Sequence, residues 1–295
     1  MKVTKKSINV AGHQLRCTLM DPEDSIKPRA VCLFTHGQGD HSERYTEVLH
    51  PFTKRGIRCI AFDLRGHGQS PGKRGHVGKV SFIDAVIDKG IKMAGNLPYG
   101  IAGHSMGGLL TLRHLTLALQ GRLALPHFCW VNSVLLSPTH NKPDWFIATA
   151  KILAKIHPRF MVKTGATPEL CQTPTDGNLI ERDPDHPGHQ HISIGWGVEL
   201  IKTASFVKKT LPLMASDIPF LYTQGGTDLI CPDQLAQQFI SSLKLTNKTY
   251  KLFPHMRHET FAEPDHQLIF GTIDHWLDEN SHRIYHLPYP YAKLF

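Results

Sequence analysis

Long apolar segments are missing from this chain of 295 residues, in which no uninterrupted apolar run reaches the length of about 18 residues that a spanning helix needs. The basic N-terminus, Met1–Lys6, is not followed by the apolar stretch of a secretory signal. With 41% hydrophobic and 20% charged residues, the composition is that of an ordinary globular protein. We therefore expect a cytoplasmic protein and leave open a peripheral contact with a membrane.

Metal-binding spacings are missing as well. The six cysteines form no Cys-x-x-Cys pair, and the 20 histidines include no His-x-x-x-His motif with a glutamate. Three of the cysteines lie in apolar, strand-like runs, which favours reduced and buried thiols. The formal net charge of +8 is spread along the chain without a dense basic run or a nucleic-acid-binding motif. The sequence therefore predicts no metal, no cofactor and no nucleic-acid partner.

Strand-like and helix-like patterns, by contrast, alternate along the first 138 residues. Residues 3–20 alternate loosely between apolar and polar side chains, which predicts an antiparallel hairpin at a sheet edge. Continuously apolar runs predict buried strands at Ala30–Phe34, Ile57–Phe62, Tyr99–Ala102 and Val131–Leu136. Helical patterns are found at Tyr45–Lys54, Ser81–Gly95 and Met106–Gln120. This alternation predicts an α/β fold with a mostly parallel, doubly wound sheet.

The same rhythm resumes after residue 214. It predicts strands at Pro219–Thr223 and Thr249–Phe253, and helices at Gln234–Leu243 and Asp265–Asn280. The last helix is predicted to bury a face formed by Leu268, Ile269, Ile273, Trp276 and Leu277. We therefore interpret residues 1–138 and 215–295 as two parts of one core.

Residues 139–214 do not follow this rhythm, and we interpret them as an inserted helical cap. Helical segments at Asp144–Ile156 and Ile194–Leu211 flank a loop at 173–191 that is rich in Pro, Asp, His and Gly. The first helix has one apolar face and one basic face, formed by Trp145, Ile152 and Ile156 and by Lys151, Lys155 and Arg159. That pattern suits a lid that touches membranes, and it equally suits a surface helix packed on its apolar side.

A candidate nucleophile stands where the strand at 99–102 meets the helix at 106–120. In the sequence Gly103-His104-Ser105-Met106-Gly107, glycines two residues before and after Ser105 allow a sharp turn from strand to helix. Such a turn exposes the serine hydroxyl in front of the helix N-terminus. The pattern is typical of a nucleophile elbow when strand and helix flank it, as they do here.

Two further residues complete the chemistry that a serine nucleophile needs. In hydrolases with such a sheet, nucleophile, acid and base follow one another along the chain, and Ser105, Asp228 and His258 have this order. The imidazole accepts the serine proton, and the carboxylate orients the imidazole and stabilises its cation. Asp228 is preferred because Gly225-Gly226 places it in a turn directly after a strand, whereas Asp217 and Asp233 are the alternatives. His258 is preferred to His255 because it leads towards the final helix.

Backbone N–H groups are predicted to stabilise the oxyanion that forms on the substrate carbonyl. The donors would be Gln38, in the loop after the strand at 30–34, and Met106, directly after the nucleophile. Parallel sheets bind ligands at the carboxyl ends of their strands, where both residues fall.

These motifs resemble the monoacylglycerol lipase and lysophospholipase group of serine α/β-hydrolases. The likeness rests on the loop His36–Tyr45, on Asp63–Ser70, on the elbow, and on Thr227-Asp228 and His258. It implies the α/β-hydrolase fold with a helical cap, cleavage of esters of single-chain lipids, and substrate contacts for Asp40, Arg44 and Cys231. Two positions depart from the group, since Asp40 replaces its usual glutamate and Phe261 replaces a histidine. Both positions bear on the recognition of a glycerol head group.

The sequence therefore predicts a serine ester hydrolase that cleaves monoacylglycerols or lysophospholipids through an acyl-enzyme. A first alternative is a peptidase or amidase related to aminopeptidases, which would need an acidic anchor in the cap, with Glu169 and Glu181 as candidates. A second alternative is a non-catalytic scaffold that binds a ligand or partner. The oligomeric state and the role of the aromatic tail at 285–295 are not predicted.

Overall fold

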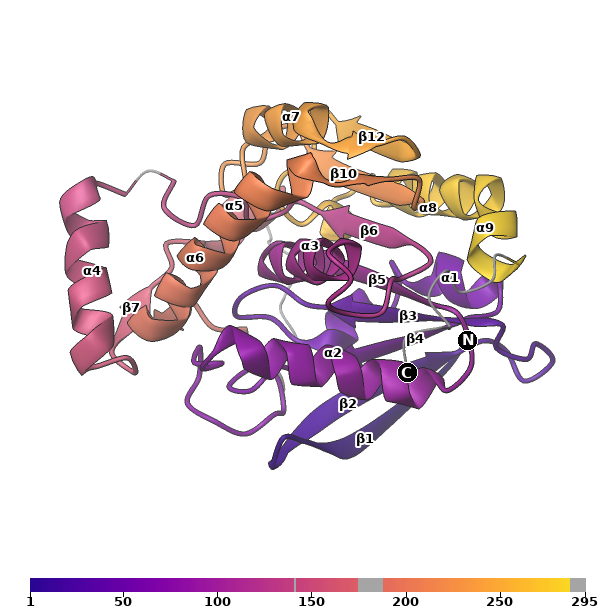
Figure 1. Ribbon diagram of the computed structural model, residues 1–295, viewed down its shortest axis with the longest axis horizontal. Helices are drawn as coiled ribbons and strands as arrows, with labels where there is room; N and C mark the ends of the chain where they lie inside the picture. Colours follow the sequence, from indigo (N-terminus) through magenta and orange to yellow (C-terminus); the bar gives the residue numbers. More distant parts are fainter. Residues whose placement is uncertain (141, 175–187, 287–295) are drawn as a thin grey trace.

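The computed structural model describes residues 1–140, 142–174 and 188–286, and an eight-stranded sheet forms its centre (Figure 1). The strands are β1 (Lys2–Val10), β2 (His13–Asp21), β3 (Ala30–Thr35), β4 (Ile57–Phe62), β5 (Tyr99–His104), β6 (Cys129–Asn132), β10 (Phe220–Gly225) and β12 (Lys248–Phe253). They lie in the order β1-β2-β4-β3-β5-β6-β10-β12. β1 and β2 form the predicted antiparallel hairpin. The other six strands of the sheet run parallel to one another. The predicted mostly parallel sheet is confirmed.

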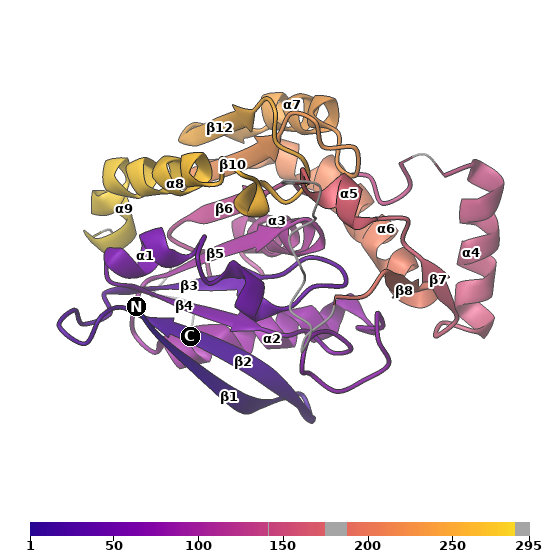
Figure 2. The same ribbon diagram turned by 180° about the vertical axis from the view of Figure 1, so that it is seen from behind.

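Helices cover both faces of this sheet (Figures 1 and 2). One face carries α2 (Val80–Ala94), α3 (Met106–Leu119), α6 (Ile194–Thr210) and α7 (Asp233–Ser242). The opposite face carries α1 (His50–Lys54), α8 (Gln267–Glu279) and α9 (Ser281–His286). Side chains alternate between the faces of a strand, so neighbours such as Val31 and Cys32 on β3 belong to two different hydrophobic cores. This arrangement is the doubly wound sheet that the sequence predicted.

Three local predictions differ from the structure. The helix predicted at 45–54 is shorter, because a 3₁₀ turn at Ser42–Tyr45 precedes α1, which begins only at His50 with Pro51 in its first turn. The strand predicted at 131–136 ends at Asn132, since the chain turns out of the sheet at Ser133, whose φ is 45°. Leu268 was wrongly placed on the buried face of the last helix: it is 60% exposed because it lies one residue, about 100°, off the stripe that starts at Ile269.

The segment that the sequence predicts to be a cap, residues 139–214, lies between β6 and β10 in the chain. It consists of α4 (Asp144–Ile156), β7 (Met161–Lys163), α5 (Pro168–Cys171), β8 (His191–Ser193) and α6. β7 and β8 pair antiparallel, and the remaining short elements are β9 (Ala215–Ser216), β11 (Lys244–Leu245) and 3₁₀ turns at Leu211–Leu213 and Thr260–Ala262. The inner side of α6 belongs to the main hydrophobic core, whereas α4 stands apart at the left of Figure 1. Most of the predicted loop at 173–191 lies outside the described residues.

The apolar face of α4 points away from the protein. None of its residues is buried, and Trp145, Ile152 and Ile156 are each more than 60% exposed. Packing of this face against the core, one of the two interpretations of the sequence, is therefore wrong. Among the described residues, no helix combines the length and the apolarity that crossing a bilayer requires.

Candidate active site

Ser105 sits on a strained turn between β5 and α3. Its φ of 54° is in the left-handed region, which a residue with a side chain adopts only when its surroundings impose it. The flanking glycines allow the turn: a Cβ on Gly107 would lie 1.9 Å from the carbonyl oxygen of Thr35, and one on Gly103 would lie 2.5 Å from that of Gly107. The spacing of the motif is thus explained by close approach of α3 to the ends of β3 and β5.

The structure brings Ser105, His258 and Asp228 together from three separate segments. We call this chain of hydrogen-bonded side chains the relay. Nε2 of His258 lies 2.9 Å from Oγ of Ser105, and Nδ1 of the same ring lies 2.8 Å from Oδ2 of Asp228. All three residues are buried. Each comes from a loop at the carboxyl end of a parallel strand, after β5, β10 and β12 respectively, which is why residues so distant in sequence meet.

Backbone and side-chain donors fix the carboxylate of Asp228. Its Oδ1 accepts hydrogen bonds of 2.8 Å from the backbone N–H groups of Ile230 and Cys231, and its Oδ2 accepts one of 3.2 Å from Gln224. Burial alone would lower the pKa of His258, but the neighbouring Asp228 carboxylate raises it well above its ordinary value of 6.5. The arrangement therefore stabilises an imidazolium at this position.

The rival candidates lie elsewhere. Asp217 is paired with Arg283 at the surface, Asp233 begins α7, and His255 is exposed. The preference for Asp228 and His258 thus agrees with the geometry.

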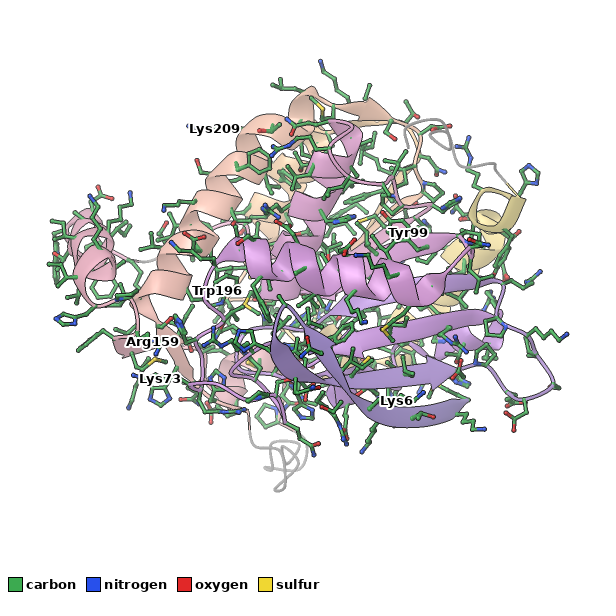
Figure 3. The ribbon with its side chains drawn as sticks, turned by 60° about the horizontal axis from the view of Figure 1, so that its bottom comes forward. Lys6, Lys73, Tyr99, Arg159, Trp196 and Lys209 are labelled. Carbon is green, nitrogen blue, oxygen red and sulfur yellow. The ribbon has the colours of Figure 1, made fainter. Side chains whose placement is uncertain are left out.

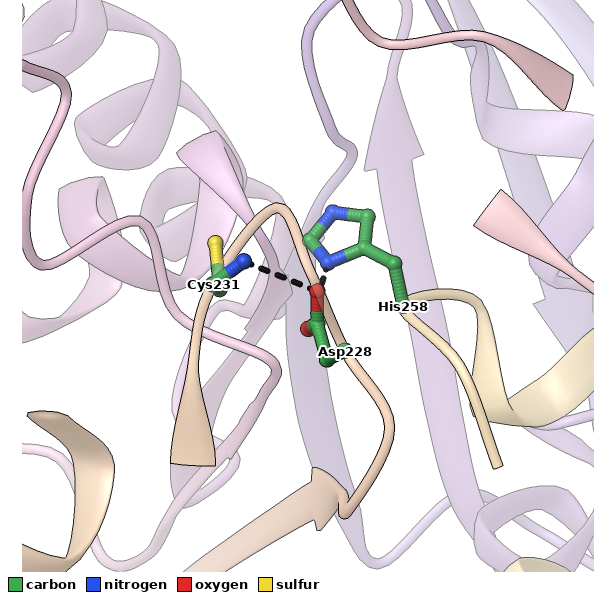
Figure 4. Close-up of side chains that lie close together, drawn as sticks. All are labelled: Asp228, Cys231 and His258. Atoms are coloured by element: carbon green, nitrogen blue, oxygen red, sulfur yellow. Dashed lines mark hydrogen bonds and ion pairs between the residues drawn. The ribbon is translucent and has the colours of Figure 1, made fainter. Parts of the chain in front are cut away.

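Cys231 lies beside Asp228 and His258, as Figure 4 shows. In the part of the chain that is described, these three residues form the one group whose ligand atoms are close enough for a metal, within 4.8 Å of one another. The chemistry does not fit a metal, because both ring nitrogens of His258 and both oxygens of Asp228 already have hydrogen-bond partners. Burial also raises the pKa of the Cys231 thiol, which disfavours the thiolate that a metal would require.

The backbone N–H groups of Gln38 and Met106 lie on the two segments that meet at Ser105. Gly37, directly before Gln38, is so close that a Cβ there would lie 3.5 Å from Cβ of Ser105. Met106 is the first residue of α3, where backbone N–H groups have no partner within the helix. Within residues 1–140, 142–174 and 188–286, neither N–H donates to a backbone or side-chain acceptor. Both remain available to a ligand.

Asp40 and Arg44 belong to a buried ionic network. Arg44 binds Oδ2 of Asp40 at 2.9 Å and Oε2 of Glu259 at 2.7 Å, while the hydroxyl of Tyr45 donates to Asp40 at 2.7 Å. Burial alone would raise the pKa of Asp40, but Arg44 and its other partners hold it well below its usual range. Phe261 packs against Tyr45 in a tilted arrangement, with ring centroids 4.7 Å apart. Asp40 and Glu259 reach the cavity described next, whereas Arg44 acts as the link between them.

A cavity of about 380 Å³ opens above Ser105. Most of its apolar lining comes from residues between 139 and 214, which include Phe146, Ile147, Val162, Leu170, Val198 and Ile201. Ser105 and His258 lie in its wall, whereas Cys231 lines a small neighbouring pocket, with its thiol within 4.8 Å of a ring nitrogen of His258. A concave, mostly apolar space with a few convergent polar groups is typical of a small-molecule site.

Asn132 is a site residue that the sequence analysis missed. Its carbonyl oxygen accepts the N–H of Ser105 at 2.9 Å. Its side-chain Oδ1 accepts from Thr223 on β10 at 2.9 Å and from Thr260 at 3.0 Å, and its Nδ2 lies 2.9 Å from Nδ1 of His104. One asparagine therefore joins the segments that carry Ser105, Asp228 and His258. The signal that the sequence offered for this role is that Asn132 is a polar residue within the apolar run 131–136.

Replacing Asn132 by Ala is expected to lower the free energy of unfolding by about 3 kcal/mol. The change removes the acceptor of the buried Thr260 hydroxyl and the partner of Nδ1 of His104, and it deprives Thr223 of its shortest hydrogen bond. Each buried polar group that loses its partner is costly. Chemical denaturation measures the loss. Asn247→Ala, which removes one partly buried bond to Asn280, is the control and should cost about 1 kcal/mol. Equal losses in the two variants would contradict the role of Asn132.

Comparisons with known proteins agree with this geometry. The family described as serine aminopeptidase, S33, matches residues 26–265. Human monoglyceride lipase is 27% identical over 282 residues, which cover 93% of this chain and 90% of that protein. An abhydrolase domain-containing protein of Dictyostelium discoideum is 30% identical over 258 residues, but the chain spans only 27% of its length. The solved monoacylglycerol lipase of Paleococcus ferrophilus has a TM-score of 0.76 and 27% identity, with 90% of this chain and 99% of that chain covered.

The sheet, the elbow and the relay together define a serine hydrolase of the α/β-hydrolase fold. The chain belongs to the serine aminopeptidase S33 family. The resemblance to monoacylglycerol lipases seen in the sequence is confirmed, and the chain is a serine ester hydrolase.

Proposed function

We propose that the protein hydrolyses carboxylic esters of single-chain lipids through an acyl-enzyme formed on Ser105. The observation that carries this proposal is the continuous relay from Ser105 through His258 to Asp228 at the floor of an apolar cavity. The relatives named as monoacylglycerol lipases support a lipid ester as the substrate.

In the first half of the reaction, Oγ of Ser105 attacks the ester carbonyl carbon, and its proton passes to Nε2 of His258. The carbonyl oxygen becomes an anion and receives hydrogen bonds from the N–H groups of Gln38 and Met106. The carbon–oxygen bond to the alcohol then breaks, and His258 returns the proton to the leaving alcohol. Asp228 keeps the ring in the required tautomer throughout.

In the second half, water attacks the acyl-enzyme. His258 accepts a proton from this water and donates one to Oγ of Ser105 when the tetrahedral intermediate collapses, which releases the fatty acid. The chain's own residues hold every proton in this cycle. We accordingly retain the prediction that no metal or organic cofactor takes part.

The cavity supports an acyl chain as the part of the substrate that is bound most extensively. Its cap-derived wall is apolar, and a fatty acyl chain offers the large apolar surface that such a wall binds. We keep the division into a cap at 139–214 and a core at 1–138 and 215–295 as part of this proposal. The cap then sets the acyl-chain length, and the residues after β3 and β12 face the alcohol.

An amide substrate is the second candidate, because the family description names aminopeptidases. Such enzymes need an acidic anchor for the substrate amine. The carboxylates that reach the cavity, Asp40 and Glu259, are both bound by Arg44. Glu169 is on α5 and does not line the cavity, and Glu181 lies outside the described residues. The ester is therefore the better supported substrate, and the intact relay disfavours the non-catalytic scaffold.

A panel of substrates tests the choice between these classes. We expect turnover of long-chain monoacylglycerols or lysophospholipids and of p-nitrophenyl esters, with kcat/KM at least about 100-fold above that for aminoacyl p-nitroanilides. The reason is that an acyl chain fills the apolar cavity, whereas a free amine meets no unpaired carboxylate there. Higher kcat/KM for the anilides would contradict the proposed substrate class.

We further propose that α4 contacts the surface of a membrane or micelle. Its exposed apolar stripe of Trp145, Ile152 and Ile156 is flanked by Lys151 and Lys155. An amphipathic helix of this kind inserts its apolar side between lipid head groups, and its lysines attract anionic lipids. The cavity opens beside the same helix, since Phe146 and Ile147 of α4 line it. A peripheral membrane contact is compatible with the predicted cytoplasmic location.

Replacing both Ile152 and Ile156 by Ser is expected to weaken binding to anionic phospholipid vesicles, measured by co-sedimentation, by about tenfold or more. The reason is that two apolar side chains that would insert into the lipid are lost. Turnover of the water-soluble p-nitrophenyl acetate should be unchanged. Leu268→Ser, which changes a 60% exposed leucine on α8, is the control and should bind vesicles normally. Unaltered vesicle binding by the α4 variant would contradict the proposed contact.

A further inference from the structure

The cap residue Trp196 contacts the side chains of both residues whose backbone N–H groups we assign to the oxyanion. Its indole Nε1 lies 3.2 Å from Oε1 of Gln38 and 3.3 Å from Sδ of Met106. One side chain at the start of α6 thus joins the loop after β3 to the first residue of α3. Figure 3 labels Trp196 where α6 meets the body of the protein.

The side-chain amide of Gln38 is held at both ends by the cap. Its Nε2 donates to the carbonyl oxygen of His191 at 3.0 Å, while its Oε1 accepts from Trp196. The opposite orientation of the amide would set oxygen against the carbonyl oxygen and N–H against the indole N–H. Only one orientation therefore satisfies both neighbours, and Gln38 cannot turn without losing two hydrogen bonds.

The segment that carries Trp196 is itself anchored to the core. The N–H of Ser193 donates to the carbonyl oxygen of Gly75 at 3.0 Å, and its Oγ lies 2.7 Å from Nδ1 of His76. The same Oγ caps α6 by accepting the N–H of Trp196 at 3.3 Å. Trp196 is fully buried among apolar side chains. It therefore provides a fixed point for the loop that carries Gln38.

The loop that Trp196 holds has a glycine on each side of Gln38, and the φ of Gly39 is +78°, a conformation that glycine adopts without strain. The backbone of both glycines is held, since the N–H of Gly37 donates to the hydroxyl of Tyr45 at 3.3 Å and the N–H of His189 donates to the carbonyl oxygen of Gly39 at 2.9 Å. The two bonds of the Gln38 side chain add restraints at the residue whose N–H we assign to the oxyanion.

We propose that Trp196 is a positioning residue for the oxyanion hole and that it acts through Gln38. The inference rests on the proposed function, since it needs an oxyanion that forms above Ser105. The bonds from Trp196 and to His191 orient Gln38, and Trp196 also contacts the side chain of Met106, which carries the second donor. Loss of the indole N–H frees the loop and weakens binding of the transition state more than binding of the substrate.

Trp196→Phe tests this role because it retains an aromatic ring and removes the N–H. We expect kcat on p-nitrophenyl butyrate to fall about 10- to 100-fold, which is less than complete removal of an oxyanion donor causes, while KM changes less than about threefold. An alkylboronic acid, which forms a tetrahedral anion on the serine, should lose affinity by the same factor as kcat/KM. A merely structural defect would not produce this matched loss.

Trp276→Phe is the matched control. Trp276 is also buried, on α8, and its Nε1 has no hydrogen-bond partner among the described residues. The substitution removes the same atoms as Trp196→Phe, so we expect a similar change in the free energy of unfolding, but an unchanged kcat. Gln38→Met supplies an independent test, because it keeps the length of the side chain and deletes both bonds to the cap. It should reproduce the loss in kcat. The kcat of the double variant with Trp196→Phe should be no lower than that of the less active single variant.

The outcomes separate this inference from the proposed function. Wild-type kcat in Trp196→Phe, a loss confined to KM, or strictly multiplicative losses in the double variant would overturn the positioning role. If Trp196→Phe does not fold, Gln38→Met decides by the same kcat and boronic acid readouts, and wild-type values overturn the inference. Retained turnover in Ser105→Ala would instead overturn the proposed function itself.

Discussion

Replacing Ser105 by Ala is expected to lower kcat on p-nitrophenyl butyrate by about 10⁶-fold, which is typical for the loss of a serine nucleophile. The thiol of Cys231 lies within 4.8 Å of a ring nitrogen of His258, but burial raises its pKa and so disfavours the thiolate that would be needed to replace the Ser105 nucleophile. The fold should persist, since Oγ contacts polar groups of the site itself, His258 and the thiol of Cys231, and both keep other partners. Steady-state kinetics and circular dichroism measure the two effects.

Ser133→Ala is the matched control for this experiment. Ser133 is likewise buried and has a positive φ of 45°, and its Oγ has no partner in the described part of the chain. Its replacement should leave kcat within about twofold of the wild type. A Ser105→Ala variant as active as Ser133→Ala would show that ester hydrolysis does not pass through Ser105.

Replacing Asp228 by Asn is the prediction with the second largest effect: kcat should fall by about 10⁴-fold. The amide of Asn can place an N–H against Nδ1 of His258, which favours the tautomer with the proton on Nε2. In that tautomer Nε2 cannot accept the proton of Ser105. Asp217→Asn is the control, because Asp217 lies at the surface in a pair with Arg283. Its activity should equal that of the wild type. A loss of less than tenfold in Asp228→Asn would contradict the orienting role.

The pH dependence gives the Asp228 variant a second readout. His258 must be neutral to accept the serine proton, so kcat/KM rises as pH increases through the pKa of His258. Asp228 raises that pKa well above 6.5, so the ascending limb of the wild-type profile should lie above pH 6.5. In Asp228→Asn the raising charge is gone and burial remains, so the limb should move to lower pH. An unmoved limb would contradict this assignment of the pKa shift.

The sequence was sufficient for those parts of the site that depend on local signals. The glycines around Ser105 predicted a turn between strand and helix because their spacing matches a close approach of α3 to the sheet. Chain order then selected Asp228 and His258, since each follows a predicted parallel strand and such strands end at the same edge. The fold class and most strand positions followed from apolar runs that alternate with helical patterns, although the strand predicted at 131–136 is in fact Cys129–Asn132.

The parts that could not be predicted depend on contacts between distant segments. Periodicity assigned two faces to α4 but could not decide what the apolar face meets, and the structure leaves it exposed. Arg44 was expected at the substrate, whereas it links Asp40 to Glu259, a partner 215 residues away. Nothing in the local pattern of Trp196 indicated its contact with Gln38, 158 residues away. These contacts are consequences of the tertiary fold.

The nucleophilic role of Ser105 is the central claim, and trapping the covalent adduct tests it most directly. The purified protein would be treated with an alkyl fluorophosphonate, digested and examined by peptide mass spectrometry. We predict one stoichiometric adduct on the peptide that contains Ser105, and none in the Ser105→Ala variant. An adduct on a different residue, or undiminished labelling of Ser105→Ala, would contradict the mechanism.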